Sequence, residues 1–108
     1  MSFLERGGQP TSDAELVAAL RAGDQDAYAA LVDELTPPLT RLALAHVPSR
    51  AVAEEVVQDT WLGVINGIDR FEGRSSLRTW IIRIVANIAQ TRGAREARSV
   101  PLSSLAPE

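Results

Sequence analysis

The residues best suited to chemistry in this chain are arginine and amide side chains that recur at helical spacing. Four polar side chains share one predicted helix face: Arg83, Asn87, Gln90 and Thr91. Arg, Asn and Gln have the shapes that hydrogen-bond base edges, and Arg also neutralises phosphate. This face indicates a nucleic-acid contact, and an ordinary solvated basic face is the alternative interpretation.

A glycine- and serine-containing loop, residues 71–76, precedes that predicted helix. It ends where the first amides of the helix point outward, and such amides favour anions. A pocket there could hold a phosphate or an extruded base. Trp61 and Trp80 fall on apolar stripes and are interpreted as core residues, although Trp80 could also line the pocket, with Phe71 near it.

A second candidate face lies upstream, on a predicted helix over residues 50–68. Four side chains follow i, i+3, i+4, i+7 spacing there: Glu55, Gln58, Asp59 and Leu62. Carboxylates, an amide and an exposed leucine could bind a basic partner helix. The alternative is a solvated helix face with one isolated surface leucine, which is common in globular proteins.

The chain lacks the residues that metal binding and catalysis require, and it lacks a membrane-spanning segment. The chain has no cysteine and a single histidine, His46, so neither a thiolate nor a histidine metal cluster is expected. No catalytic set and no glycine-rich phosphate loop is evident, so we expect no enzyme activity and no cofactor. No apolar run approaches the roughly 20 residues of a membrane span, and no signal peptide is evident. We therefore expect a cytoplasmic protein without membrane contact.

The charges are distributed unevenly. Residues 1–69 contain 4 Arg and 11 acidic residues, whereas residues 70–98 contain 7 Arg and 2 acidic residues. This division suggests two surfaces with two partners, of which the basic one could meet an anion such as nucleic acid. All basic residues are Arg, a bias that a GC-rich genome would also produce.

Helices must position these side chains. The capping box at residues 12–15 predicts a short helix to about residue 22. Asp24 can cap a second helix over about 25–47, whose apolar positions include Leu42 and His46. Pro37-Pro38 interrupts this stretch while its apolar phase continues, so we expect a kink or two nearly collinear helices.

Two further helices complete the predicted fold. Ser49 can cap the helix over 50–68, and Ser75 or Ser76 can cap a helix from residue 77 into the nineties, where Gly93 is expected to fray the end. Nothing indicates a strand, so the expected fold is all-α, a compact bundle of about four helices. The predicted organisation is a tail over 1–11, a domain over 12–98 and a linker over 99–108.

Two segments of the chain resemble segments of a known family. Residues 53–62, with the string Val-Val-Gln-Asp-Thr-Trp, resemble the polymerase-binding segment (region 2.2) of extracytoplasmic-function sigma factors. Residues 71–87, with Ser-Ser-Leu-Arg-Thr-Trp, resemble their promoter-melting and −10-recognition segments. The resemblance covers about residues 12–98, and the two strings at this separation are a specific signal.

The resemblance implies partners and roles. It assigns Glu55, Gln58, Asp59 and Leu62 to a coiled coil on the polymerase β′ subunit, in the RNA polymerase core. It implies that the loop and the next helix capture the non-template strand of the −10 element of promoter DNA, with one base flipped into a loop pocket. The residues implied around this pocket are Phe71, Gly73, Arg74, Ser75, Ser76, Arg78 and Trp80. Those implied along the DNA are Arg83 and Asn87, with Arg92, Arg95 and Arg98 at phosphates.

The resemblance also implies an anti-sigma factor as a possible partner on the polymerase-binding face, and a C-terminal helix-turn-helix domain that reads the −35 element. We therefore expect this chain to be a piece of a longer protein. It departs from the family at Ala86, where Arg is common, and at Thr91, where Asp is common; Gly93-Ala94 dilutes the basic run.

Two other functions fit the same residues. One is a helical protein–protein interaction module of another regulator, whose basic face meets an acidic partner. The other is a duplex-binding helix-turn-helix, although the predicted loop at 69–76 is long for the turn of that motif.

Overall fold

The chain folds into a bundle of four α-helices. A computed structural model describes residues 12–99, with only the backbone of residues 98 and 99. The helices are α1 (Asp13–Arg21), α2 (Gln25–Leu44), α3 (Arg50–Gly67) and α4 (Leu77–Ser99), with a short 3-10 turn, η2 (Ile68–Arg70), after α3. The predicted all-α class is confirmed, with no strand among residues 12–99.

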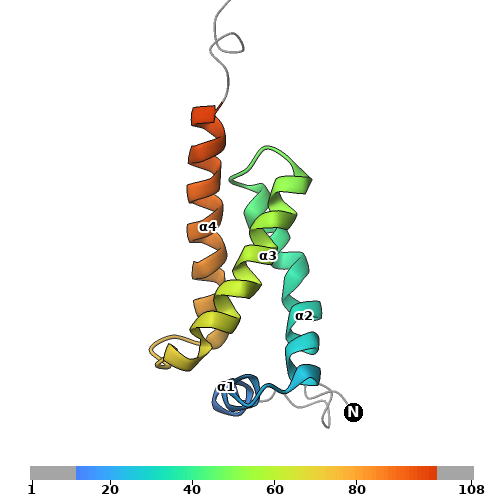
Figure 1. The fold of residues 1–108 in the computed structure, drawn as a ribbon, viewed down its shortest axis with the longest axis vertical. Coiled ribbons are helices and arrows are strands. Elements are labelled where there is room, and N and C mark those ends of the chain that lie inside the picture. The colour runs from blue at the N-terminus through green and yellow to red at the C-terminus, as the bar shows by residue number, and fades with distance from the viewer. Residues whose placement is uncertain (1–11, 100–108) are drawn as a thin grey trace, which may run out of the picture.

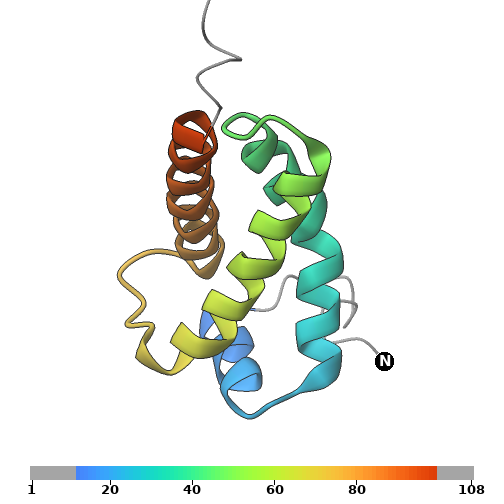
Figure 2. The same cartoon turned by 45° about the horizontal axis from the view of Figure 1, so that its top comes forward.

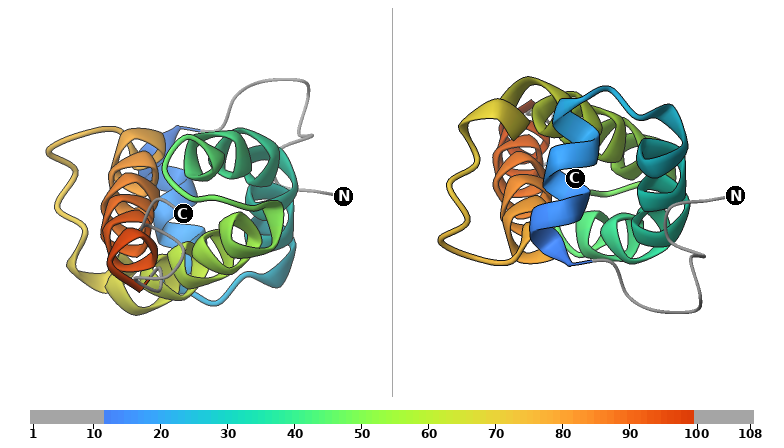
Figure 3. Two further views of the ribbon diagram at one scale, coloured as in Figure 1. Left: turned by 90° about the horizontal axis from the view of Figure 1, so that it is seen from above. Right: turned by 90° about the horizontal axis from the view of Figure 1, so that it is seen from below.

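Helices α2, α3 and α4 form the body of the bundle, and α1 crosses one end of it. Helices α2, α3 and α4 pack against one another in pairs, and α1 lies across the end where α3 finishes and α4 begins (Figure 1). Seen from below, α1 passes between the loop before α4 and the start of α2 (right panel of Figure 3). The predicted tail at 1–11 and all of the predicted linker after Ser99 lie outside the described residues.

Each helix begins at a predicted cap, the capping residues being Ser12, Asp24, Ser49 and Ser76. The sequence left Ser75 and Ser76 open as caps of α4. The hydroxyl of Ser76 accepts the Thr79 amide N–H at 3.0 Å, so Ser76 is the cap. These bonds satisfy amides that the first helical turn leaves without a partner, which is why the helix starts could be predicted.

The second helix is one continuous element, so it is not divided at its prolines. Pro37 and Pro38 lie inside α2. Its buried positions recur at i, i+4 from Ala27 to Ala43, a narrower stripe than the sequence predicted. Leu42 is therefore 38% exposed. His46 lies beyond the helix end and is exposed. Counting these two residues among the apolar positions of the helix was therefore wrong.

The core is apolar, and its polar atoms are paired. The predicted inward stripe of α3 is buried throughout, from Ala53 to Ile68. Trp61 is 7% exposed, and its indole N–H donates to the Thr36 hydroxyl at 3.3 Å. Its ring meets Tyr28 edge-on, with centroids 5.9 Å apart. Trp61 is therefore a core residue, as predicted. No described helix is long and apolar enough to cross a bilayer.

Helix α4 lies very close to its neighbours. A Cβ added at Gly67 of α3 would lie 3.1 Å from the Trp80 ring, and one at Gly63 would lie 3.3 Å from Ile84. A Cβ at Gly93 would collide with the backbone carbonyl oxygen of His46. The predicted fraying at Gly93 was wrong: α4 continues to Ser99, and the glycine lets it pass the turn between α2 and α3.

This contact predicts an unusual response to substitution. Alanine normally stabilises a helix interior over glycine by about 1 kcal/mol. We expect Gly93→Ala to lower the free energy of unfolding instead, by about 1–3 kcal/mol, because the backbone of His46 must move. The measurement is urea unfolding of the domain. Ala94→Gly is the control, since Ala94 is exposed and should show the ordinary preference for alanine. A raised urea midpoint in Gly93→Ala would contradict the close approach.

Candidate nucleic-acid and protein interfaces

The outer face of α3 is open to solvent as predicted. Glu55, Gln58, Asp59 and Leu62 are all exposed, because the opposite side of α3 packs against α2 and α4. Leu62 is 58% exposed and Ile65 is 52% exposed. The sequence analysis missed Ile65, although its i+3 spacing from Leu62 was available as a signal. The face therefore combines carboxylates with two apolar side chains.

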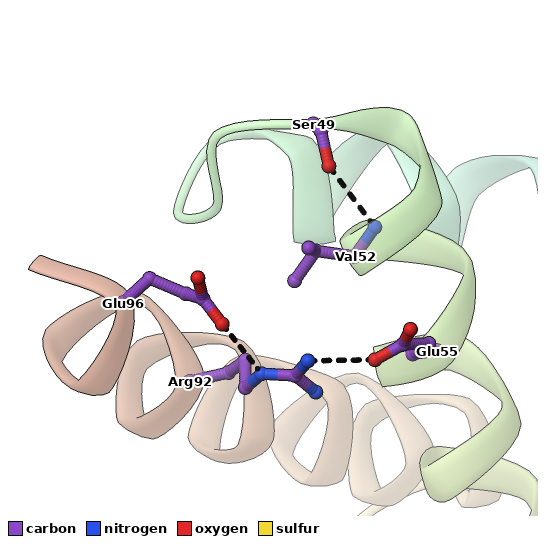
Figure 4. A network of polar contacts seen from close by, with 5 residues as sticks. All are labelled: Ser49, Val52, Glu55, Arg92 and Glu96. Carbon is purple, nitrogen blue, oxygen red and sulfur yellow. Dashed lines mark hydrogen bonds and ion pairs between the residues drawn. The ribbon is translucent and has the colours of Figure 1, made fainter. Parts of the chain in front are cut away.

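An ion-pair network joins this face to α4 (Figure 4). The Nη2 of Arg92 lies 2.6 Å from Glu55 Oε1, and its Nε lies 3.1 Å from Glu96 Oε2. The hydrogen bonds to Glu55 and then to Glu96 raise the pKa of Arg92 above its ordinary value. The sequence assigned Arg92 to phosphate and Glu55 to a protein partner, whereas in the free domain each is held by the other.

The two predicted faces meet in an open depression between α3 and α4. Its lining residues are Asp59, Asn87, Ile88, Thr91, Arg92 and Arg95. Asp59 belongs to the predicted polymerase face, and Asn87 to the predicted DNA face. The sequence placed them on separate surfaces because helical spacing shows which residues share one helix face but not which helix lies beside it.

The polar face of α4 has the predicted composition. Arg83, Asn87, Gln90 and Thr91 are all exposed. Within residues 12–99, Arg83 makes no ion pair, in contrast to Arg92. The side chain of Arg98, a predicted phosphate contact, lies outside the described residues. The face therefore presents one unpaired guanidinium and two amides along about two turns of helix.

A pocket lies beside the loop that precedes α4. Three predicted residues line it: Phe71, Gly73 and Ser75. Gly73 has a φ of +75°, a backbone conformation that favours glycine. The opposite side of the pocket is α1, which contributes Asp13, Ala14, Val17 and Arg21. The sequence analysis missed these four residues, because no local pattern indicates that α1 lies against this loop.

The other residues that the resemblance assigned to the pocket are not among its lining residues. Arg74 is largely exposed and pairs with Glu72 at 3.1 Å. Arg78 reaches α2, with its Nη1 3.4 Å from Glu34 Oε2. Ser76 caps α4. Trp80 is half-buried, and its ring packs against that of Phe71, a residue that lines the pocket, with centroids 5.0 Å apart.

The chain is similar to characterised proteins along most of its length. The family Sigma-70 region 2 matches residues 31–99. The ECF RNA polymerase sigma-E factor of Escherichia coli (strain K12) is 32% identical over 94 residues, covering 87% of this chain and 49% of that protein. The protein of the same name from Haemophilus influenzae is 29% identical over 97 residues, covering 90% and 51%. The chain thus spans about half the length of these curated relatives.

A solved structure shares the fold. It is the NMR structure of the complex formed by an engineered region 2 of sigmaE with GTAAAA. The two chains have 28% sequence identity and a TM-score of 0.71, over 83% of this chain and 94% of that one.

The Glu55–Arg92 pair predicts a small effect on folding. Glu55 is more than half exposed, so solvent and salt screen the pair. We expect Glu55→Gln, which keeps a hydrogen-bond acceptor and removes the charge, to leave the urea midpoint nearly unchanged and to reduce its dependence on salt. Glu54→Gln is the control, since Glu54 pairs with Arg50 on α3 itself. A large loss of stability in Glu55→Gln at high salt would show that the pair is structural.

Proposed function

The chain belongs to the Sigma-70 region 2 family, as the region 2 domain of an extracytoplasmic-function sigma factor, and on this premise we propose that it binds core RNA polymerase and captures the −10 promoter element. The observation that carries the proposal is the position of the loop pocket, which lies at the N-terminal end of the helix that presents Arg83 and Asn87. The domain supplies recognition, and catalysis belongs to the polymerase.

We propose that the non-template strand follows α4 and ends in the loop pocket. Arg83 neutralises phosphate, and Asn87 and Gln90 hydrogen-bond base edges. One base leaves the stack and enters the pocket between Phe71 and Ser75, which offsets a melting cost of a few kcal/mol. The solved relative binds GTAAAA, which supports a short nucleic-acid strand as the ligand proposed for this domain.

The α3 face is the proposed contact with polymerase. Glu55, Gln58 and Asp59 provide acceptors for a basic helix of the β′ coiled coil, and the exposed Leu62 provides an apolar contact on the same face. Arg92 holds Glu55 only through an exposed pair, so a polymerase arginine or lysine can replace it at little cost. An anti-sigma protein is a further proposed partner, for which Leu62 and Ile65 supply the apolar area.

The whole protein is proposed to contain more than this domain. We assign residues 12–98 to region 2, with the tail and linker as predicted. A C-terminal helix-turn-helix domain that reads the −35 element would account for the remaining length of the relatives. The proposed place of action is the cell interior, where polymerase and DNA are found.

The polymerase contact is tested by a pull-down of bacterial core polymerase. We expect Gln58→Ala/Asp59→Arg to weaken binding at least about tenfold, because it removes an acceptor and places a cation against a basic partner. Asp33→Arg is the matched control: it makes the same charge reversal at an exposed position of α2. The contact is wrong if the double variant binds polymerase as tightly as the wild type does.

The ion-pair network predicts that the arginines of α4 are not equivalent toward DNA. Each phosphate contact on a single strand contributes about −0.7 to the slope of log K against log salt. Arg83→Ala should reduce the steepness by about that amount. Arg92→Ala should reduce it less, because two carboxylates already offset the charge. Fluorescence anisotropy over a salt series measures both slopes.

The same salt series also tests whether the domain binds DNA phosphates at all, which the interaction-module alternative does not require. Equal slope changes in both arginine variants would contradict the different environments of the two side chains. Binding without any salt dependence would contradict the phosphate contacts altogether.

A further inference from the structure

Two charged residues of α1 hold the two ends of the pocket loop. Arg21 donates from Nε to the Ile68 carbonyl at 3.0 Å and from Nη2 to the Phe71 carbonyl at 2.6 Å. Asp13, at the other end of α1, accepts the Leu77 amide N–H at 2.8 Å. One helix of nine residues therefore contacts the chain immediately before the loop and immediately after it.

Arg21 binds the carbonyls of Ile68, the C-cap of α3, and of Phe71, the C-cap of η2, where a cation is electrostatically favoured. The amides of a first helical turn have no partner within the helix. Asp13 binds the first amide of α4, where an anion is favoured. The partners are 47 to 64 residues apart in sequence, so both contacts are tertiary and depend on α1 crossing this end of the bundle.

Few hydrogen bonds join the loop to distant parts of the chain. Among the described residues, the hydrogen bonds of residues 71–76 run within the loop or to the flanking η2 and α4, except for the bond from Arg21 to Phe71. The loop projects from the bundle beside α1 (Figure 2). Among the described residues, Arg21 is therefore the side chain that hydrogen-bonds the loop to another helix, while the Phe71 ring packs against Trp80 of α4.

The same helix also forms one side of the pocket. Ala14 and Val17 line it from α1, opposite Phe71 and Gly73. Helix α1 precedes the span that matches the family, residues 31–99. The pocket is thus built from a segment inside the matched span and a segment before it.

Resting on the proposed function, we propose that α1 is part of the base-binding site, with Arg21 and Asp13 as positioning residues. By fixing both ends of the loop, they hold the pocket in its binding shape before DNA arrives. A loop ordered in advance loses less conformational entropy on binding, so affinity for the extruded base is higher. Ala14 and Val17 set how much room that base has.

The experiment begins with selection. Randomised single-stranded oligonucleotides are selected on the wild-type domain, and the sequence obtained is remade with an abasic site at each position in turn. The abasic position with the largest loss of affinity marks the pocket base. Arg21→Gln should weaken binding of the intact strand about tenfold. It should cause no loss on the strand that lacks the pocket base, because no base then occupies the pocket.

Matched variants separate positioning from charge and from folding. Arg41→Gln removes the same charge near the far end of α2 and should keep wild-type discrimination at the pocket base. Arg21→Lys keeps the charge but cannot donate in the same forked geometry, so it should not restore affinity. Polymerase binding through α3 should be unchanged in all three variants.

A second variant tests the pocket without touching the loop bonds. Ala14→Phe places a ring into the pocket from an exposed position of α1. It should weaken binding of the intact strand and not of the strand that lacks the pocket base. If Arg21→Gln does not fold, the binding of Ala14→Phe tests whether α1 is part of the pocket.

The outcomes distinguish the two proposals. If the wild type selects no sequence, the proposed function is wrong. If it selects one, but Arg21→Gln or Ala14→Phe weakens every abasic strand equally, α1 contributes only charge or stability, and the further inference is overturned. Full affinity in both variants would overturn it as well.

Discussion

The close packing of α4 against the rest of the bundle is the constraint on which the other features depend. This helix must bury one stripe, which includes Leu77, Ile81 and Val85, while its opposite side stays open. It lies so near the turn after α2 that Gly93 has no room for a side chain, and so near α3 that a Cβ at Gly67 would press against the Trp80 ring. Because interiors are close-packed and adjust little, this approach fixes both the direction of α4 and the place where its loop begins.

The proximity of α3 and α4 also explains why two predicted faces form one surface. Asp59 and Asn87 line the same depression, and Glu55 binds Arg92 across the boundary. Glu55 is more than half exposed, and ion pairs of this kind contribute little to stability, so Glu55 can exchange partners without disturbing the fold. A polymerase contact at Glu55 would leave Arg92 paired with Glu96 alone and make more of its charge available to phosphate, which connects the two proposed interactions without any movement of helices.

The sequence was informative wherever the determinants were local. Capping residues bond amides three positions away, so Ser12, Asp24 and Ser49 could be recognised from order alone, and Ser76 as one of two candidates. Apolar spacing likewise identified the inward stripe of α3. The contacts that escaped prediction join distant residues: Arg21 with Phe71, and Gly93 with His46. The spacing of apolar residues shows which side of a helix faces inward, but it does not show which other segment packs against that side.

The candidate site also contains some residues whose positions could be predicted and others whose positions could not. The resemblance placed Phe71, Gly73 and Ser75 around a pocket, and these three residues line the one beside the loop. The resemblance placed Arg78 there too, but its side chain pairs with Glu34 of α2 and is not among the lining residues. A family motif names the residues that occur together, whereas the direction of a helical side chain depends on the 3.6-residue turn.

The departures from the family can now be placed on the surface. Thr91, where related factors commonly carry an acidic residue, lines the depression that already contains Asp59. A second carboxylate there would repel phosphate and would compete for Arg92. Threonine keeps this part of the α4 face less negative and retains a hydroxyl that can donate or accept a hydrogen bond. Because Thr91 is exposed, its identity bears on the proposed DNA contact and not on the buried framework beneath it.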